Sequence, residues 1–269
     1  MYANRKSRCS DKGLHGASYL IAVWASTLLA SSPAWSQDII DEDANKILMA
    51  MTDNLKGLKD LSADYDADHE IVDKAGQKLQ YSASGTMALS RGKGLHLMRK
   101  GPYADVEVTF DGKMISLYGK GMNVYAQIKS PGTTPEEAVE EFRISTGLDA
   151  PGADLLSSDP YALLTEGVMS GALVGDAVVG GVECDHLAFR TDLVDWQIWI
   201  SKGDKPMPVK YVITTKWVTG APQYSLRFSN WKTDEVDAAQ FTFTPPEGAK
   251  KIEQIYSDVA GELSLEAGE

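Results

Sequence analysis

Cysteine and histidine are scarce in this chain. Its 269 residues include two cysteines and four histidines. Cys9 precedes the apolar run near the N-terminus, whereas the lipid-bearing cysteine of a bacterial lipoprotein follows such a run, so we expect no lipid on it. Neither an HExxH nor a CxxC sequence occurs, so the usual zinc sites are excluded. We therefore predict no metal site and no other cofactor.

Long apolar runs are also few. One uncharged run, residues 17–30, follows four basic residues within the first twelve. At about fourteen residues it is shorter than the roughly twenty that span a bilayer as a helix. Small residues at Ala34 and Ser36 complete the pattern of a signal peptide over residues 1–36, cleaved after Ser36. This pattern predicts a periplasmic protein without a stable membrane anchor, and an uncleaved anchor is the alternative.

Basic residues are outnumbered. The chain has 26 Lys and Arg against 38 Asp and Glu, a net charge of −12. Without residues 1–36 the balance is 22 against 37, or near −15. Nucleic acid is excluded as a partner, because binding it requires a basic surface. Only Cys184 would remain in the mature chain, so no intrachain disulfide can form, and a packed core has to supply the stability.

Hydrophobic periodicity predicts one helix and then a series of strands. Residues 38–57 carry apolar side chains at a helical period, and Gly57 follows them. From Leu61 to Ile71, apolar and polar residues alternate, which indicates a strand with one buried face. Short alternating runs joined by turns continue to residue 128 and form a meander of six strands.

Two helices and a second group of strands complete the predicted order. Thr134 followed by proline and two glutamates predicts a helix that ends at Gly147, and Pro160 begins a short helix over residues 159–166. At least five strands follow, at about 168–178, 182–190, 194–201, 207–218 and 223–232. The predicted fold class is α+β: a strongly curved antiparallel sheet of about eleven strands, a half β-barrel, with its concave face covered by about three helices. We predict a single domain over residues 37–245 and a partly ordered acidic tail over 246–269.

Several motifs resemble a known family. Residues 182–190 (VECDHLAFR) and 195–200 (DWQIWI), together with 110–113 (FDGK), resemble a family of predicted periplasmic bacterial proteins with no established activity. The fold of that family looks like the lipoprotein-carrier group of LolA, LolB and LppX, a half-barrel closed by helices around an apolar cavity. The resemblance covers nearly the whole mature chain. No cargo-binding residue of LolA can be matched to this sequence, so none is transferred.

Candidate catalytic patterns are weak. Cys184 and His186 share one face of a predicted strand at roughly 7 Å, too far apart for a hydrogen bond, so a buried core cysteine is favoured over a thiol nucleophile. Two SxxK patterns, at residues 90–93 and 229–232, fall at a turn and a strand end rather than at the start of a helix. A row of four carboxylates at residues 64–70 favours a solvated strand face over a calcium site. We predict no catalytic residue and no enzymatic activity.

The late strands carry apolar and aromatic residues on both faces, which indicates either core packing or a lined cavity. A cavity favours a non-enzymatic carrier or binding protein for a lipid, an acyl chain or another apolar ligand. The alternative is a protein-interaction or envelope-stress sensor module on the same fold, of the RseB type. Partners are then an apolar small molecule or lipid, or a lipoprotein or other envelope protein, and we expect a monomer. The predicted cavity-lining residues are Phe110, Leu117, Met122, Phe142, Trp196, Ile198, Tyr211, Ile213 and Trp217.

Overall fold

Three helices form where the sequence predicts them. The structure, a computed structural model, describes residues 39–101, 105–147, 150–253, 256–257 and 263–264. The signal peptide predicted over residues 1–36 and part of the tail predicted over 246–269 lie outside the described residues. The helices are α1 (Glu42–Gly57), α2 (Pro135–Thr146) and α3 (Pro160–Thr165), with the 3-10 turns η1 (Ala153–Leu156) and η2 (Ala238–Phe241). None of the helices in the described residues is long and apolar enough to span a membrane.

The ends of α2 are set by local hydrogen bonds. The Thr134 hydroxyl accepts a bond from the Glu137 amide at 3.3 Å, and the Glu137 carboxylate accepts one from the Thr134 amide at 3.1 Å. This capping box satisfies main-chain donors that the first helical turn leaves free. Gly147 ends the helix with a φ of 69°, in the left-handed region that glycine adopts without strain. Both boundaries agree with the prediction.

Twelve strands form one sheet. Each strand of the meander pairs with its chain neighbour in antiparallel fashion, and so do the first five strands that follow α3. Two further strands, β13 and β14, pair with each other. The strands are β1 (Asp60–Val72), β2 (Lys78–Ser90), β3 (Gly94–Lys100), β4 (Asp105–Phe110), β5 (Met114–Gly119), β6 (Val124–Lys129), β7 (Ser170–Val179), β8 (Val182–Arg190), β9 (Val194–Ser201), β10 (Pro208–Thr215), β11 (Gln223–Lys232), β12 (Lys250–Lys251), β13 (Tyr256–Ser257) and β14 (Leu263–Ser264).

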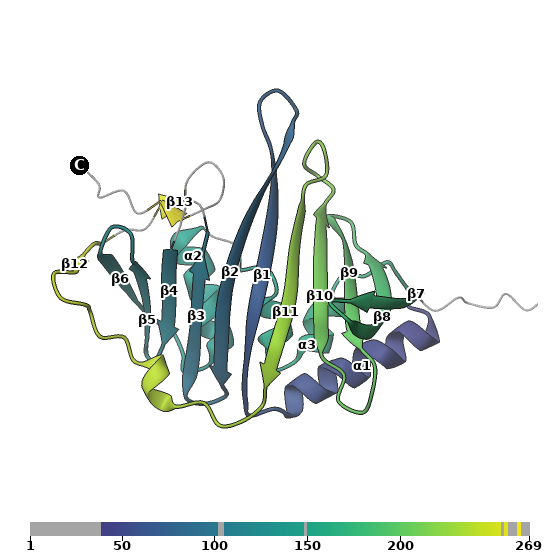
Figure 1. The fold of residues 1–269 in the computed structure, drawn as a ribbon, viewed down its shortest axis with the longest axis horizontal. Coiled ribbons are helices and arrows are strands. Elements are labelled where there is room, and N and C mark those ends of the chain that lie inside the picture. The colour runs from purple at the N-terminus through teal and green to yellow at the C-terminus, as the bar shows by residue number, and fades with distance from the viewer. Residues whose placement is uncertain (1–38, 102–104, 148–149, 254–255, 258–262, 265–269) are drawn as a thin grey trace, which may run out of the picture. The chain divides into compact units, whose positions relative to one another are not determined.

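The order of the strands divides the sheet into two halves. It runs β12-β6-β5-β4-β3-β2-β1-β11-β10-β9-β8-β7, so the early strands occupy one half and the late strands the other. The halves join where β1 pairs with β11, and these two strands lie side by side in the middle of the sheet (Figure 1). β12 adds to β6 in parallel fashion, from a segment that the sequence places in the tail.

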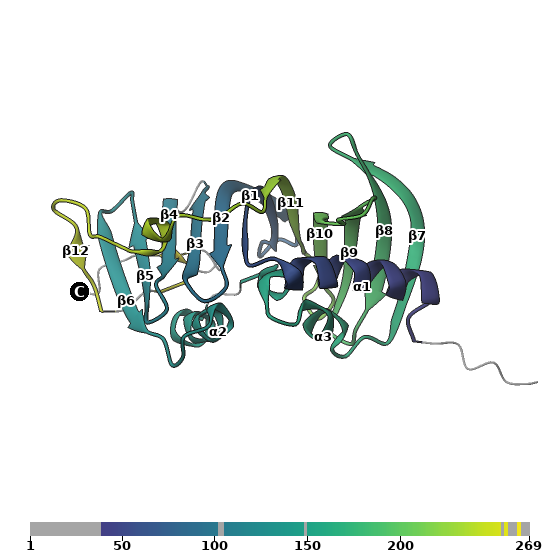
Figure 2. The same ribbon diagram turned by 90° about the horizontal axis from the view of Figure 1, so that it is seen from below.

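The core lies between the sheet and the helices. The three helices lie on one face of the sheet (Figure 2). From α1, Leu48, Met51 and Leu55 are fully buried there. On β1 the predicted alternation holds: Leu61, Ala63, Tyr65 and Ala67 are buried, and Asp64 and Asp66 are exposed.

The predicted curvature of the sheet is wrong, although the α+β class and the antiparallel pairing are confirmed. The sheet is open and is not strongly curled, so it is not a half-barrel. The helices cover it at separate places. Phe142 of α2 packs against Val106 and Leu117 of β4 and β5, whereas α1 packs beneath β7 and β9 at the other end. The buried residues of these helices nevertheless belong to one core cluster with strands of both halves of the sheet.

Candidate functional site

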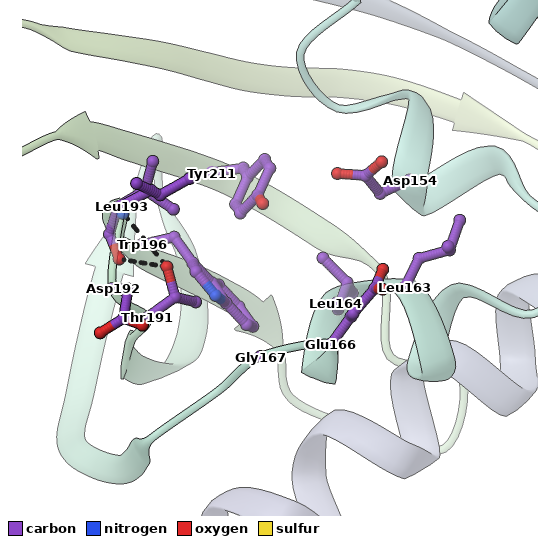
Figure 3. A pocket seen from close by; sticks show the side chains of 11 residues that line it. Asp154, Leu163, Leu164, Glu166, Gly167, Thr191, Asp192, Leu193, Trp196 and Tyr211 are labelled. Carbon is purple, nitrogen blue, oxygen red and sulfur yellow. Dashed lines mark hydrogen bonds between the residues drawn. The ribbon is translucent and has the colours of Figure 1, made fainter. Parts of the chain in front are cut away.

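A pocket opens between α3, η1 and the strands β9 and β10. Its volume is about 400 Å³. Figure 3 shows the side chains that line it. Two neighbouring strands supply its aromatic wall, α3 and the residues that follow it supply the opposite wall, and the turn before β9 forms part of the mouth. The lining residues are Asp154, Leu163, Leu164, Glu166, Gly167, Thr191, Asp192, Leu193, Val194, Trp196 and Tyr211.

Stacked rings hold the aromatic wall in place. Trp196 of β9 and Tyr211 of β10 are diagonal neighbours, because Tyr211 lies two residues from the position directly opposite Trp196. Their rings meet edge to face, with centroids 5.8 Å apart. Phe189 of β8 stacks on the other side of Trp196, with ring centroids 3.9 Å apart. Both Trp196 and Tyr211 are buried in the described structure. Aromatic pairs of this kind add to the stability that burial supplies, so these contacts favour the observed positions of the Trp196 and Tyr211 rings.

The mouth of the pocket is aliphatic and exposed. Leu163 of α3 is 46% exposed and Leu193 of the turn before β9 is 63% exposed, whereas Leu164 is buried beneath them. The Thr191 hydroxyl fixes the turn by donating to the Val194 carbonyl at 3.0 Å and accepting from the Val194 amide at 3.1 Å. Two large apolar side chains thus stand open to solvent beside an aromatic wall.

Two polar groups face the interior of the pocket. The Asp154 carboxylate, carried by η1, and the Tyr211 hydroxyl point toward the same space (Figure 3). Burial raises the pKa of Asp154 above its ordinary value, and the nearby Arg143 acts in the opposite direction. Burial also raises the pKa of Tyr211, and the charge of Asp154 adds to that effect. Neither side chain forms a hydrogen bond with another described residue.

The structure brings two of the nine predicted lining residues to this pocket, Trp196 and Tyr211. Phe110, Leu117 and Ile198 are packed in the core, and Phe142 and Ile213 are partly buried against it. Met122 and Trp217 lie on turns and are 50% and 72% exposed. Most of the side chains expected around a cavity therefore belong to the packed interior or to the surface.

Cys184 and His186, the pair considered as a thiol nucleophile and its base, each have other partners in the structure. Cys184 is fully buried, its thiol donates to the Val182 carbonyl at 3.4 Å, and burial raises its pKa. His186 hydrogen-bonds to Gln197 at 2.9 Å and stacks on Trp199 at 4.1 Å. No hydrogen bond joins Cys184 to His186 in the described part of the chain. The pair therefore has the partners of structural residues, because a buried thiol with a raised pKa is a poor nucleophile.

The row of carboxylates on β1 lies on the surface opposite the helices. Asp66 and Asp68 accept hydrogen bonds from serine hydroxyls of β2 at 2.6 and 2.5 Å, and Asp64 accepts one from Asn230 at 2.7 Å. Among the residues that the structure describes, no group of three or more Asp, Glu, His or Cys side chains could hold a metal ion. The row is therefore a hydrogen-bonded strand face.

A second, smaller pocket lies over β1, β2 and β3. Its volume is about 230 Å³, and its lining is mostly polar, with His96, Asp64 and Lys232 among the residues. His96 is bonded to Glu107 at 3.0 Å, and Lys120 pairs with the same carboxylate at 3.3 Å. Asp64 also accepts a hydrogen bond from Asn230 of the same lining, so His96 and Asp64 already have partners.

Sequence reasoning missed Asp154, Leu163 and Leu193. Asp154 stands between apolar residues in a short turn of helix, and a lone carboxylate in such a stretch is the only local signal. The two leucines are exposed, so a search for buried apolar faces passes over them. Their proximity depends on the packing of α3 and η1 against β9 and β10.

Comparison with known proteins places the chain in a family. Residues 44–255 match the family model described as Predicted periplasmic protein (DUF2092). The chain belongs to the DUF2092 family. That membership confirms the resemblance drawn from residues 182–190 and 195–200, and the description of the family agrees with the periplasmic localisation predicted from residues 1–36. Among curated proteins, this DUF2092 member has no match.

Several solved structures are similar to this DUF2092 protein. An uncharacterized conserved protein from Thermus thermophilus is 14% identical with a TM-score of 0.45, and the match covers 79% of this chain and 100% of that one. LprF from Mycobacterium bovis is 15% identical with a TM-score of 0.42, covering 78% and 98%. A LolA superfamily protein from Nitrosomonas europaea is 10% identical with a TM-score of 0.37, covering 74% and 97%. At these identities and scores, the similarity carries no argument about a ligand.

Proposed function

We propose that this DUF2092 protein is a non-enzymatic periplasmic binding or carrier protein for a lipid, an acyl chain or another apolar ligand. The observation that supports this function best is the open pocket of about 400 Å³ with an aromatic wall and an aliphatic mouth. Its volume is within the range of about 300 to 1,000 Å³ that small-molecule sites occupy. Each methylene group of a ligand buried there would contribute about 0.8 kcal/mol.

The exposed leucines support the same function. Leu163 and Leu193 keep apolar surface in water on two sides of the pocket mouth, at a cost that a bound apolar chain would remove. Trp196 and Tyr211 are held by their neighbours, so the site has little to reorganise when a ligand enters. Binding requires no covalent step, and the proposal assigns no catalytic role to any residue.

The test is a comparison of two tryptophan variants with a neutral, apolar fluorescent probe. Leu163→Trp places a larger side chain at the mouth of the pocket and should weaken probe binding by about tenfold or more. The matched control is Ile144→Trp, because Ile144 lies on α2, is 71% exposed and does not line the pocket. It should bind the probe as the parent does. Equal binding by the two variants would exclude this pocket as the site.

Native mass spectrometry of protein purified from the cell envelope supplies a second test. A co-purified apolar molecule that is retained by Ile144→Trp and lost from Leu163→Trp is the expected result. Ligand-free protein that also ignores the fluorescent probe would overturn the proposal. If such protein instead captured a stable envelope partner, the sensor alternative would be favoured.

A further inference from the structure

The charged side chains that line the pocket are all carboxylates. Asp154 and Glu166 line it from the side of η1 and α3, and Asp192 lines it at the turn before β9. None of the three carboxylates forms an ion pair or a hydrogen bond with another described side chain. A pocket with an apolar wall thus carries three carboxyl groups that are free to meet a ligand.

The basic residues near the pocket are already engaged. Lys216 donates to the Thr191 carbonyl and pairs with Asp195 at 3.2 Å. Arg143 pairs with Glu140 at 3.3 Å and influences Asp154 from outside the lining. No lysine or arginine lines the pocket in the described part of the chain. An anionic headgroup would therefore meet carboxylates without a compensating cation.

The Tyr211 hydroxyl gives the site a second, independent feature. Tyr211 is only 4% exposed, its hydroxyl forms no hydrogen bond with a described residue, and it points into the same space as the Asp154 carboxylate (Figure 3). The hydroxyl oxygen is not among the fully enclosed side-chain atoms that lack a partner in the described residues, so it is open to the pocket. A ligand that donates hydrogen bonds to both oxygens would give each of them a partner.

We propose that the pocket selects amphiphiles whose apolar part carries a protonated amine, and that it rejects the corresponding carboxylates and phosphates. This inference rests on the proposed function and adds the headgroup to it. An ammonium group has three donors and no acceptor, which matches the Asp154 carboxylate and the Tyr211 hydroxyl as acceptors. Its positive charge is also opposite in sign to the carboxylates that line the pocket. Glu166 and Asp192 at the mouth attract the same charge.

Three probes with one chain length test the headgroup directly: decylammonium, decanol and decanoate. Each displaces a neutral fluorescent probe, below the micelle concentration for the two ions and below the solubility limit for decanol. We expect decylammonium to bind about tenfold more tightly than decanol, and decanoate to bind more weakly than both. Equal affinities of decylammonium and decanoate would overturn the headgroup assignment while leaving the apolar site intact. Failure of all three to bind would instead overturn the proposed function.

Asp154→Asn keeps the size of the side chain and removes its charge. It should lower the affinity for decylammonium by about tenfold and the affinity for decanol by much less, because the decanol hydroxyl carries no charge, and far-ultraviolet circular dichroism reports whether the variant is folded. The matched control is Glu235→Gln, which removes the same charge from a side chain that is 80% exposed and does not line the pocket. An equal loss in both variants would show attraction to the net charge of the chain rather than to the pocket.

Glu166→Gln provides a second variant in case Asp154→Asn does not fold. Because Glu166 is exposed, its charge acts through water, and we expect a loss of decylammonium affinity of about two- to threefold, with a smaller loss for the uncharged decanol. An unchanged affinity for decylammonium in both Glu166→Gln and Asp154→Asn would overturn the inference.

Discussion

The guanidinium of Arg91 joins three segments of the chain, and its removal has a predictable cost. Its Nε donates to the Leu58 carbonyl at 3.1 Å and its Nη2 to the Leu55 carbonyl at 3.3 Å, both at the C-terminal end of α1. Its Nη1 donates to the Leu156 carbonyl of η1 at 3.1 Å and lies 3.7 Å from Glu136 of α2. Burial lowers the pKa of Arg91, and Glu136 acts against that effect.

Arg91→Met keeps much of the aliphatic stem and removes all of these bonds. A hydrogen bond to a charged group contributes about 1.5–3 kcal/mol. The side chain is 21% exposed, so water can replace part of what is lost, and the 3.3 Å bond is longer than the usual optimum. Counting the two shorter bonds at the lower value gives an expected loss of about 3 kcal/mol in the free energy of unfolding.

Urea unfolding followed by far-ultraviolet circular dichroism measures this loss. The matched control is Arg190→Met, since Arg190 is 63% exposed and contacts Asp195 through one bond of 3.3 Å. Its removal should cost less than about 1 kcal/mol. If Arg91→Met also lost less than about 1 kcal/mol, the bonds to the ends of α1 and η1 would not be holding these segments together, and the reasoning would be refuted.

Three further variants test the core, a close contact and the buried carboxylate. Leu48→Ala, in the fully buried face of α1, should cost about 2–5 kcal/mol in urea unfolding, and a loss below about 1 kcal/mol would contradict the packing. Gly85→Ala should lower the free energy of unfolding by about 2 kcal/mol or more, because a Cβ there would lie 2.5 Å from the Tyr65 ring. In the control Gly57→Ala, the added Cβ meets nothing within 4 Å, so this variant should be neutral or slightly stabilising. Equal melting temperatures of the two variants would contradict the close contact. Asp154→Asn should raise the free energy of unfolding at neutral pH. Burial raises the pKa of Asp154, so the carboxyl favours folding below its ordinary pKa of 3.8 and loses that contribution as pH rises through the raised value. An uncharged asparagine avoids this loss at neutral pH. The gain should vanish in acid, and a gain that is independent of pH would contradict this cause.

Local patterns predict the elements well because their causes are local. The capping box of Thr134 and Glu137 depends only on residues within one stretch of four. The alternation of buried and exposed side chains along residues 61–67 follows from the pleat of a single strand. The short strand β12 has no such signal, since its two lysines join the sheet only through their register with Val124 and Tyr125.

The candidate site is harder to predict, because the alternation of apolar and polar residues assigns a side chain to a face only as far as the strand continues. The pattern over residues 207–218 predicts one strand, which places Trp217 on the same face as Tyr211. The strand β10 ends at Thr215, whose amide bonds to the Pro222 carbonyl across the turn, and Trp217 therefore stands in solvent. Asp154 requires knowledge of which strands η1 covers, and no local pattern contains that information.

The pairing of β1 with β11 has a consequence for export. Ser62 lies opposite Lys232, so the central seam of the sheet joins the beginning of the domain to nearly its last strand. In a chain that crosses a membrane with its N-terminus first, β1 emerges long before its neighbour. Closing so long a loop is slow. The domain therefore completes its sheet only after β11 has also crossed, although β1 to β6 can pair with one another before then.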